Sequence, residues 1–302
     1  MSFNDDVRLD TSQVRSGGRG GGPRGLVVGG GIGGLVVLVI AMIFGINPSD
    51  LPTATSPDDR GQVQPAGSED GAAFARCESG SLTNTDIECR VIGTVNSVQD
   101  FWTDELVRYT LEWQPTDTVL YRGQTPSACG TASNRVGPFY CPLDRLVYID
   151  AGFFEVLEQQ FGSSGGPLAQ EYVVAHEYGH ALQDQLGLLG RAQQDPQGAE
   201  SGAVRTELMA DCLAGVWAHH ASSTENADGE LLMEPLTDGD IRDALSAAAA
   251  VGDDRIQAAT SGRVDPESWT HGSAASRQQW FLSGYESGDL NRCDTFAVDS
   301  VG

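Results

Sequence analysis

The sequence contains no lysine, and arginine supplies all 18 of its basic residues against 42 acidic residues. The formal net charge of the 302-residue chain is −24 at pH 7. A surface of this sign repels the phosphate backbone of nucleic acids, which proteins contact chiefly through Lys and Arg. The composition therefore argues against a nucleic-acid partner.

The sequence also lacks any C-x-x-C spacing, which disfavours a zinc site made of cysteines, and it has no repeat of solenoid length. All six cysteines follow residue 76, and an even number of cysteines suggests disulfides in an oxidising compartment. Six cysteines allow fifteen pairings. Closure of short loops favours Cys77 with Cys89 and Cys129 with Cys141, which leaves Cys212 to pair with Cys293.

Only one apolar run is long enough to cross a membrane, and it covers residues 26–46 without a single charge. At about 1.5 Å per residue, a helix of this length spans a bilayer core of about 30 Å. Arg15, Arg19 and Arg24 precede the run, whereas the first basic residue after it is Arg60. The positive-inside rule then predicts a cytoplasmic N-terminus and an outer domain. A cleaved signal peptide is the alternative, but the run is long and no small-x-small cleavage site follows it.

The rest of the chain divides by composition. We expect residues 1–25 to be a cytoplasmic tail, residues 47–76 to be a flexible linker rich in Pro, Gly, Ser and Asp, and residues 77–302 to form one domain. Apolar spacing predicts helices at 91–109, 153–162, 168–186, 200–220, 239–250 and 271–286, and strands at 118–123 and 145–150. The expected fold class is α+β, mainly helical with a small sheet.

The helix predicted at 168–186 carries the pattern H-E-x-x-H in His176, Glu177 and His180. Residues four apart lie on one face of a helix, so both imidazoles can reach a single metal ion. The carboxylate of Glu177 projects beside that ion, where it can take a proton from an activated water. The alternative is a pair of exposed histidines on a surface helix.

A catalytic zinc site needs a third protein ligand. The next predicted helix supplies Glu207 as that ligand, and Asp211, one turn later, can accept the N–H of a ligating imidazole. The alternative is a solvated acidic face, yet the neighbours of both carboxylates are apolar: Leu208, Met209, Ala210, Cys212 and Leu213. The H-E-x-x-H pattern followed by E-x-x-x-D is far more specific for a zinc site than either pattern alone.

The stretches VAHEYGHALQ and VRTELMADCLAGVWA resemble the bacterial neutral zinc metallopeptidases of the YpfJ type, within the gluzincin group. The resemblance runs from about Cys77 to Phe296 and includes GPFYCPLDRLVYID and THGSAASRQQW. It implies a zincin-like fold with zinc held by His176, His180 and Glu207, Glu177 as general base, and Asp211 behind a ligand. It also makes residues 145–150 a candidate for the edge strand that binds substrate.

Related zinc peptidases place a His or Tyr downstream to stabilise the oxyanion, and His271 is the best candidate here. Tyr285 and Arg277 are alternatives, as is a purely structural His271. His219 and His220, at the end of a helix, are expected to be structural, and Trp280 and Phe281 to lie in the core. Phe139 and Tyr140 could reach the cleft if the loop between Cys129 and Cys141 folds over it.

The sequence therefore predicts a single-pass membrane protein whose extracytoplasmic domain binds Zn²⁺ and hydrolyses peptide bonds in a peptide or protein substrate. Two alternatives stay open. One is an interaction module in which zinc only stabilises the fold, and the other is a zinc amidase that acts on cell-wall peptides.

Overall fold

The structure is a computed structural model, and it describes residues 2–17 and 73–302. The membrane helix predicted at 26–46 lies outside the described residues. The same holds for residues 47–72 of the predicted linker. Within the described ranges, no helix combines the length and apolar character that crossing a membrane requires. The observed fold is mainly helical with a small sheet, so the predicted α+β class is confirmed.

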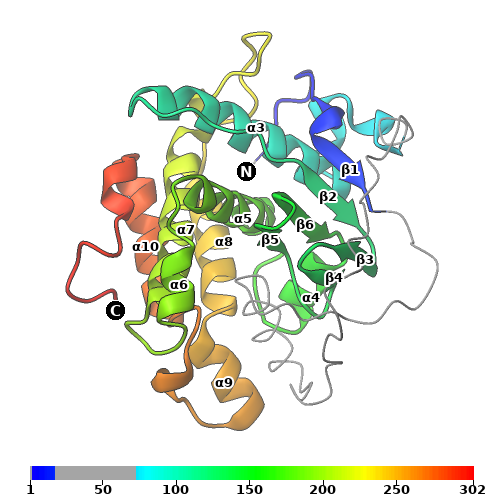
Figure 1. Cartoon of the computed structure of the whole chain (residues 1–302). Coiled ribbons are helices and arrows are strands. Elements are labelled where there is room, and N and C mark those ends of the chain that lie inside the picture. The colour runs from blue at the N-terminus through cyan, green and yellow to red at the C-terminus, as the bar shows by residue number, and fades with distance from the viewer. Residues whose placement is uncertain (1, 18–72) are drawn as a thin grey trace, which may run out of the picture.

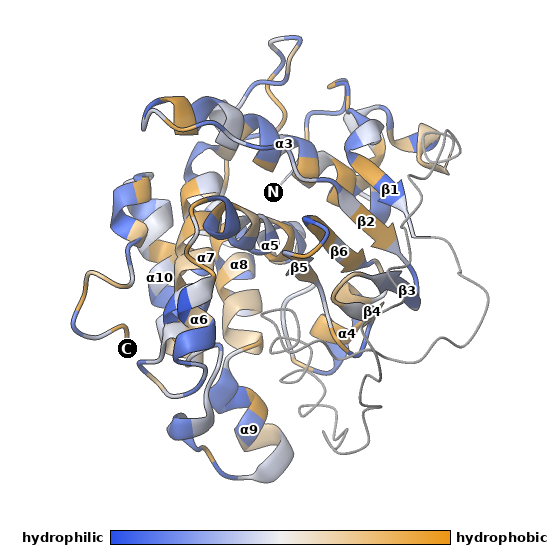
Figure 2. Cartoon of the chain, viewed as in Figure 1, coloured by the Kyte–Doolittle hydropathy of each residue, from blue (hydrophilic) through white to orange (hydrophobic). Residues whose placement is uncertain are grey.

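The main sheet has four strands in the order β1 (Val14–Ser16), β2 (Thr118–Tyr121), β6 (Leu146–Asp150) and β5 (Phe139–Cys141) (Figure 1). The first three are parallel, and β5 runs antiparallel to β6 with Phe139 opposite Tyr148. Helices pack on the sheet, and apolar residues follow β2, β6 and the central helices in Figure 2.

The strand order places β6 inside the sheet, between β2 and β5. Residues 146–150 do form a strand, but the prediction that this strand is the substrate-binding edge was wrong. Val147, Tyr148 and Ile149 are all buried, as expected of a strand covered on both faces. The edge on this side of the sheet is β5.

A second sheet of two antiparallel strands, β3 (Gln124–Ser127) and β4 (Gly130–Ser133), was not predicted. The Cys129–Cys141 disulfide joins its turn to β5. The other two disulfides are Cys77–Cys89 and Cys212–Cys293, so all three predicted pairings are confirmed.

The six predicted helices are present with shifted ends, and two short helices were missed. The described helices are α3 (Ile87–Val107), α4 (Phe153–Gln159), α5 (Pro167–Gln185), α6 (Gly190–Gln194), α7 (Gly202–His220), α8 (Asp238–Ala250), α9 (Asp253–Ser261) and α10 (Ala274–Ser287). The unpredicted helices are α6 and α9. Short 3-10 turns also occur, among them η1 (Thr11–Gln13), which precedes β1, and η7 (Leu290–Cys293), which follows α10.

The boundaries of α5 and α7 follow from local chemistry. Pro167 occupies the first turn of α5, where its missing N–H costs nothing, and Gly187 ends the helix with φ of +71°. At the start of α7, the hydroxyl of Ser201 accepts a hydrogen bond from the backbone N–H of Val204. Both helices are buried on most of their faces.

Glycines let these helices approach closely. A Cβ on Gly179 of α5 would lie 3.1 Å from Cα of Ala210 in α7, and a Cβ on Gly215 of α7 would lie 2.1 Å from the carbonyl oxygen of Phe281 in α10. Larger side chains at either position would push the helices apart. The short distance between α5 and α7 is what brings side chains of both helices to one point.

Residues 2–17, which we call the N-terminal arm, pack against this domain. Phe3, Val7, Leu9 and Val14 are buried in the same core as α3 and α5, and the arm supplies β1. The folded body therefore includes residues that the sequence analysis assigned to a separate cytoplasmic tail, and it does not begin at Cys77. The arm is polar and lacks regular apolar spacing, so its sequence gives no strand or helix signal.

Candidate metal centre and catalytic cleft

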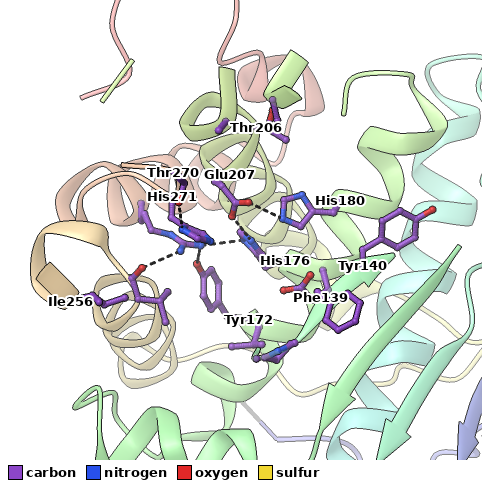
Figure 3. Close-up of a pocket in the computed structure, with 18 of the residues that line it drawn as sticks. Phe139, Tyr140, Tyr172, His176, His180, Thr206, Glu207, Ile256, Thr270 and His271 are labelled. Carbon is purple, nitrogen blue, oxygen red and sulfur yellow. Dashed lines mark hydrogen bonds and ion pairs between the residues drawn. The ribbon is translucent and has the colours of Figure 1, made fainter. Parts of the chain in front are cut away.

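His176 and His180 lie one turn apart on α5, and their rings face Glu207 of α7 (Figure 3). His176 Nε2 is 3.2 Å from Oε2 of Glu207, and His180 Nε2 is 3.5 Å from Oε1. One donor atom from each of the three residues lies within 4.8 Å of the others. Donor atoms around a tetrahedral zinc ion stand about 3.4 Å apart, given bonds of about 2.1 Å. The two imidazoles and the carboxylate thus fit zinc in both chemistry and spacing.

Asp211, one turn after Glu207, orients His176. Its Oδ1 lies 2.8 Å from His176 Nδ1, and Arg277 donates to both carboxylate oxygens, from Nε at 2.8 Å and from Nη2 at 2.9 Å. The hydroxyl of Tyr172 donates to the same carboxylate. Burial alone would raise the pKa of Asp211, but Arg277 and His176 hold it below its usual range. An ionised carboxylate only accepts, so Nδ1 of His176 carries the proton and Nε2 faces Glu207.

The same contacts shift the pKa of His176. Burial acts to lower it, but the Asp211 carboxylate and its hydrogen bond raise the pKa of His176 to about 9. Burial likewise acts to raise the pKa of Glu207, whereas His180 and His271 hold it well below its usual range. A divalent cation takes the place of the second imidazole proton in such a site, so metal binding releases protons.

Gln183 orients the second histidine, a role that the sequence analysis did not assign. Its Oε1 lies 2.8 Å from His180 Nδ1, and its Nε2 donates to the carbonyl oxygen of Thr206 at 2.7 Å. The side chain is fully buried. Gln183 therefore fixes the ring of His180 and ties α5 to α7 next to Glu207. Its position three residues after His180 on the same helix was the available signal.

Glu177 is buried beside the two histidines and lines the same cavity. Burial raises its pKa, an effect that His176 and His180 partly offset. The backbone N–H of Tyr140 in β5 donates to the Glu177 carboxylate. The hydroxyl of Tyr140 donates to Asp184, two turns after Glu177, at 2.8 Å, so the edge strand is fastened to α5.

His271 lies in the segment just before α10 and not in the helix itself, which begins at Ala274. Its Nδ1 is 3.5 Å from Oδ1 of Asp253 and 2.9 Å from the Thr270 hydroxyl. Burial acts to lower the pKa of His271, but Glu207 and Asp253 raise it overall. Because Nδ1 faces Asp253 and Thr270, Nε2 is the ring nitrogen available to the cavity that His271 lines.

Asp253, at the start of α9, is held by the backbone. One of its oxygens accepts N–H groups of Thr270 at 2.8 Å, His271 at 2.7 Å and Gly272 at 3.0 Å. The pKa of Asp253 is lowered because these bonds and His271 outweigh its burial. No local pattern predicts a role for Asp253, since its partners lie 17 to 19 residues away in a loop without a motif.

The structure distinguishes the remaining aromatic, histidine and arginine candidates by whether they line the cavity. Arg277 lines the cavity, but its guanidinium is engaged by Asp211. Tyr285 does not line the cavity, and its ring stacks on Phe281 at 6.3 Å. His219 and His220 lie within hydrogen-bond distance of backbone carbonyls of Tyr285 and Gly288, in keeping with structural roles. Trp280 and Phe281 are buried, so their predicted place in the core is confirmed.

The cavity has a volume of about 160 Å³ and lies between α5, α7, β5 and the α8–α9 region. Phe139 and Tyr140 of β5 line it, as the sequence analysis considered possible. Much of the remaining wall is apolar: Phe153, Phe161, Val173, Leu189, Val251 and Ile256. An apolar cleft thus surrounds the cluster of His176, Glu177, His180, Glu207 and His271.

Comparison with known proteins agrees with this centre. An uncharacterized protein of Mycobacterium tuberculosis is 52% identical over 263 residues, which cover 87% of this chain and 87% of the relative. The uncharacterized protein YpfJ of Escherichia coli K12 is 36% identical over 286 residues, or 93% of this chain and 92% of the relative. No solved structure matches the chain. The family model described as "Putative neutral zinc metallopeptidase" matches residues 4–296, and the chain belongs to that family.

Proposed function

We propose that the chain is a zinc-dependent peptidase that hydrolyses peptide bonds with Glu177 as general base. The observation that carries the proposal is the convergence of His176, His180 and Glu207 from two helices, with the Glu177 carboxylate beside them in a cleft. A zinc ion bound there would act as a Lewis acid and lower the pKa of a water molecule. Two neutral imidazoles and one carboxylate leave a fourth position for that water.

The residues of the chain divide the proton transfers between them. Glu177 takes a proton from the attacking water and passes it to the leaving amine nitrogen. Its pKa is raised towards the working pH, where one group can act as the base in the first step and as the acid in the second. His271 donates a hydrogen bond from Nε2 to the oxyanion that develops on the carbonyl carbon.

The edge strand β5 and the apolar walls of the cavity form the proposed binding site for the substrate. Among the described residues β5 pairs only with β6, so an extended peptide can add to its outer edge through main-chain hydrogen bonds. Phe139, Val173 and Ile256 offer apolar surface to a side chain next to the bond that is cut. We therefore propose peptides with bulky apolar side chains as substrates.

We further propose that the domain works outside the cytoplasm and that residues 26–46 attach the chain to a membrane. Three disulfides close within the domain, and disulfides persist in oxidising compartments. The membrane attachment is supported by the apolar run in the sequence.

A Glu177→Gln variant of the full chain tests the peptidase. With a library of unstructured peptides as substrate, we expect kcat to fall by at least about 10²-fold because the general base is lost. The zinc content should stay at about one equivalent, since Glu177 is not a ligand. Glu286→Gln, an exposed site on α10, is the matched control and should keep full activity.

Three results would count against the proposal. Equal activity in the Glu177→Gln variant and the parent would support zinc as a purely structural ion. Hydrolysis of cell-wall peptides alone, with no cleavage of any other peptide, would support an amidase. A His180→Ala variant that binds as much zinc as the parent would show that the metal does not bind at this site.

A further inference from the structure

The N-terminal arm is held to the domain by backbone hydrogen bonds along its whole length. The N–H of Asn4 donates to Leu232 at 3.0 Å, the N–H of Leu9 to Glu78 at 3.0 Å, and the N–H of Gly17 to Leu120 at 2.9 Å. β1 also pairs in register with β2, and Arg15 forms an ion pair with Asp117. The arm is thus part of the sheet and of the surface beside it.

Two asparagines of the domain bind the backbone of the arm through the same pair of hydrogen bonds. The side-chain amide of Asn84 accepts from the N–H of Phe3 at 2.9 Å and donates to its carbonyl at 3.0 Å. Asn96 accepts from the N–H of Asp10 at 2.7 Å and donates to its carbonyl at 3.0 Å. Each amide satisfies both backbone groups of one arm residue, which is what a neighbouring strand would do.

Phe3 fills a space that a glycine leaves open. Its ring is 2% exposed, and a Cβ on Gly93 of α3 would lie 2.7 Å from Cε1 of the ring. Glycine within a helix is less favourable than alanine, so its presence in the middle of α3 needs a reason. The Phe3 ring supplies that reason.

We propose that the N-terminal arm is a permanent part of the peptidase domain and lies in the same compartment as it. Gly17, the last described residue of the arm, is hydrogen-bonded to Leu120, and the described part of the domain resumes at residue 73, so residues 26–46 lie in sequence between two segments of the same folded body. A single crossing would separate these ends by a bilayer core of about 30 Å. A cytoplasmic arm joined to a domain on the other side of the membrane is therefore excluded.

The family match gives this proposal a second basis. It begins at residue 4, inside the arm and before the apolar run, and continues to residue 296. The arm and the domain thus belong to one family pattern. This inference replaces the cytoplasmic N-terminus that the arginines before the apolar run suggested, and it does not depend on catalysis.

Single cysteines in the full chain test the shared compartment. All six native cysteines form disulfides, so an introduced cysteine is the sole thiol. Ser16→Cys places it at an exposed position in the arm, and Glu267→Cys places it at an exposed position in the domain. Cells that produce either variant are treated with a small membrane-impermeant maleimide before and after their inner membrane is permeabilised.

We expect both cysteines to be labelled to the same extent before permeabilisation, with a ratio near one. Labelling of Ser16→Cys only after permeabilisation, while Glu267→Cys is labelled before it, would overturn the proposal. So would purification of a domain from which the arm has been cleaved. If both are labelled only afterwards, arm and domain still share a compartment, and the extracytoplasmic location proposed above is what fails.

A Gly93→Ala variant tests the docking itself. Alanine in place of a helix-interior glycine would ordinarily raise Tm by about 2–4 °C. With Phe3 docked against it, the added methyl group should lower Tm. In a Phe3→Ala background the same substitution should raise Tm, because the obstructing ring is gone. An equal change of either sign in both backgrounds would show that Phe3 does not occupy this space.

Discussion

Two histidines that line the same cavity, His176 and His271, are each paired with an aspartate, and the two pairs are built in different ways. Asp211 contacts His176 at 2.8 Å from a fully buried position between α5 and α7, with Arg277 bound to both of its oxygens. Asp253 stands 3.5 Å from His271, and backbone N–H groups of residues 270–272 satisfy its carboxylate. One pair is fixed by charged side chains, and the other is fixed by a loop.

The difference matches what each histidine has to do in the proposed reaction. A metal ligand must keep its orientation before any substrate arrives, and the charged partners of His176 hold it rigidly. An oxyanion donor must already point to the place where charge develops on the oxygen, and the bonds from residues 270–272 to Asp253 hold the segment that carries His271. Disturbing the first pair should therefore affect folding and zinc, whereas disturbing the second should affect turnover alone.

Arg277→Met should give the largest effect because it leaves the Asp211 carboxylate buried without its cation. We expect the free energy of unfolding to fall by about 3–5 kcal/mol, the usual cost of removing one partner from a buried ion pair. Urea denaturation of the full chain measures this loss. Arg263→Met, at an exposed position, is the control and should stay within about 0.5 kcal/mol of the parent. A loss below about 1 kcal/mol in Arg277→Met would mean that the ion pair does not hold this centre together.

His271→Ala should lower kcat by about 10²–10³-fold, the usual loss when one oxyanion donor is removed. KM and zinc content should change little, because no hydrogen bond joins His271 to His176, His180 or Glu207 and the substitution leaves the apolar walls intact. His219→Ala removes a histidine with a structural contact and should leave kcat unchanged. Comparable activity in His271→Ala and His219→Ala would show that His271 has only a structural role.

Asp211→Asn should weaken zinc binding by about 10–100-fold, the typical cost of losing the partner of a ligating imidazole. An asparagine can donate from its amide, so it no longer imposes the tautomer that leaves Nε2 of His176 free for the metal. Competition with a chelator measures the zinc affinity. Asp253→Asn provides the comparison between the two pairs and should leave zinc affinity within about twofold of the parent. Equal zinc affinities in the two variants would show that the two aspartate–histidine pairs do not differ in their effect on the metal site.

The helical part of this centre could be predicted because its signals are local. His176 and His180 are one turn apart on α5, and Glu207 and Asp211 are one turn apart on α7, so helix geometry alone places each pair on a shared face. The three disulfides followed from short loop lengths and elimination. The two helix pairs and the two disulfides of 12-residue separation need only the spacing of residues within one segment, whereas Cys212–Cys293, 81 residues apart, followed only because the other four cysteines were already paired.

The parts that were missed depend on contacts between distant segments. Strand order cannot be obtained from an apolar run, so β6 was mistaken for the edge although β5 occupies it. The arm reaches the domain through hydrogen bonds that asparagine side chains make to its backbone, and such bonds leave no pattern in the arm itself. Asp253 likewise contacts a loop by its backbone N–H groups, which any residue except proline provides.

Asp253→Asn should have the smallest effect, and its sign depends on pH. The Asp253 charge helps to raise the pKa of His271, so removing that charge lowers the pKa of His271. If the imidazolium form donates to the oxyanion, kcat is high below this pKa and falls as pH rises through it. The alkaline limb of the kcat profile should then move to lower pH, with a loss of about tenfold on that limb and little change on the acidic side. Asparagine keeps an oxygen for the N–H groups of residues 270–272, so the loop should hold its shape. A uniform fall in kcat at every pH would show that Asp253 acts on His271 by position and not by charge.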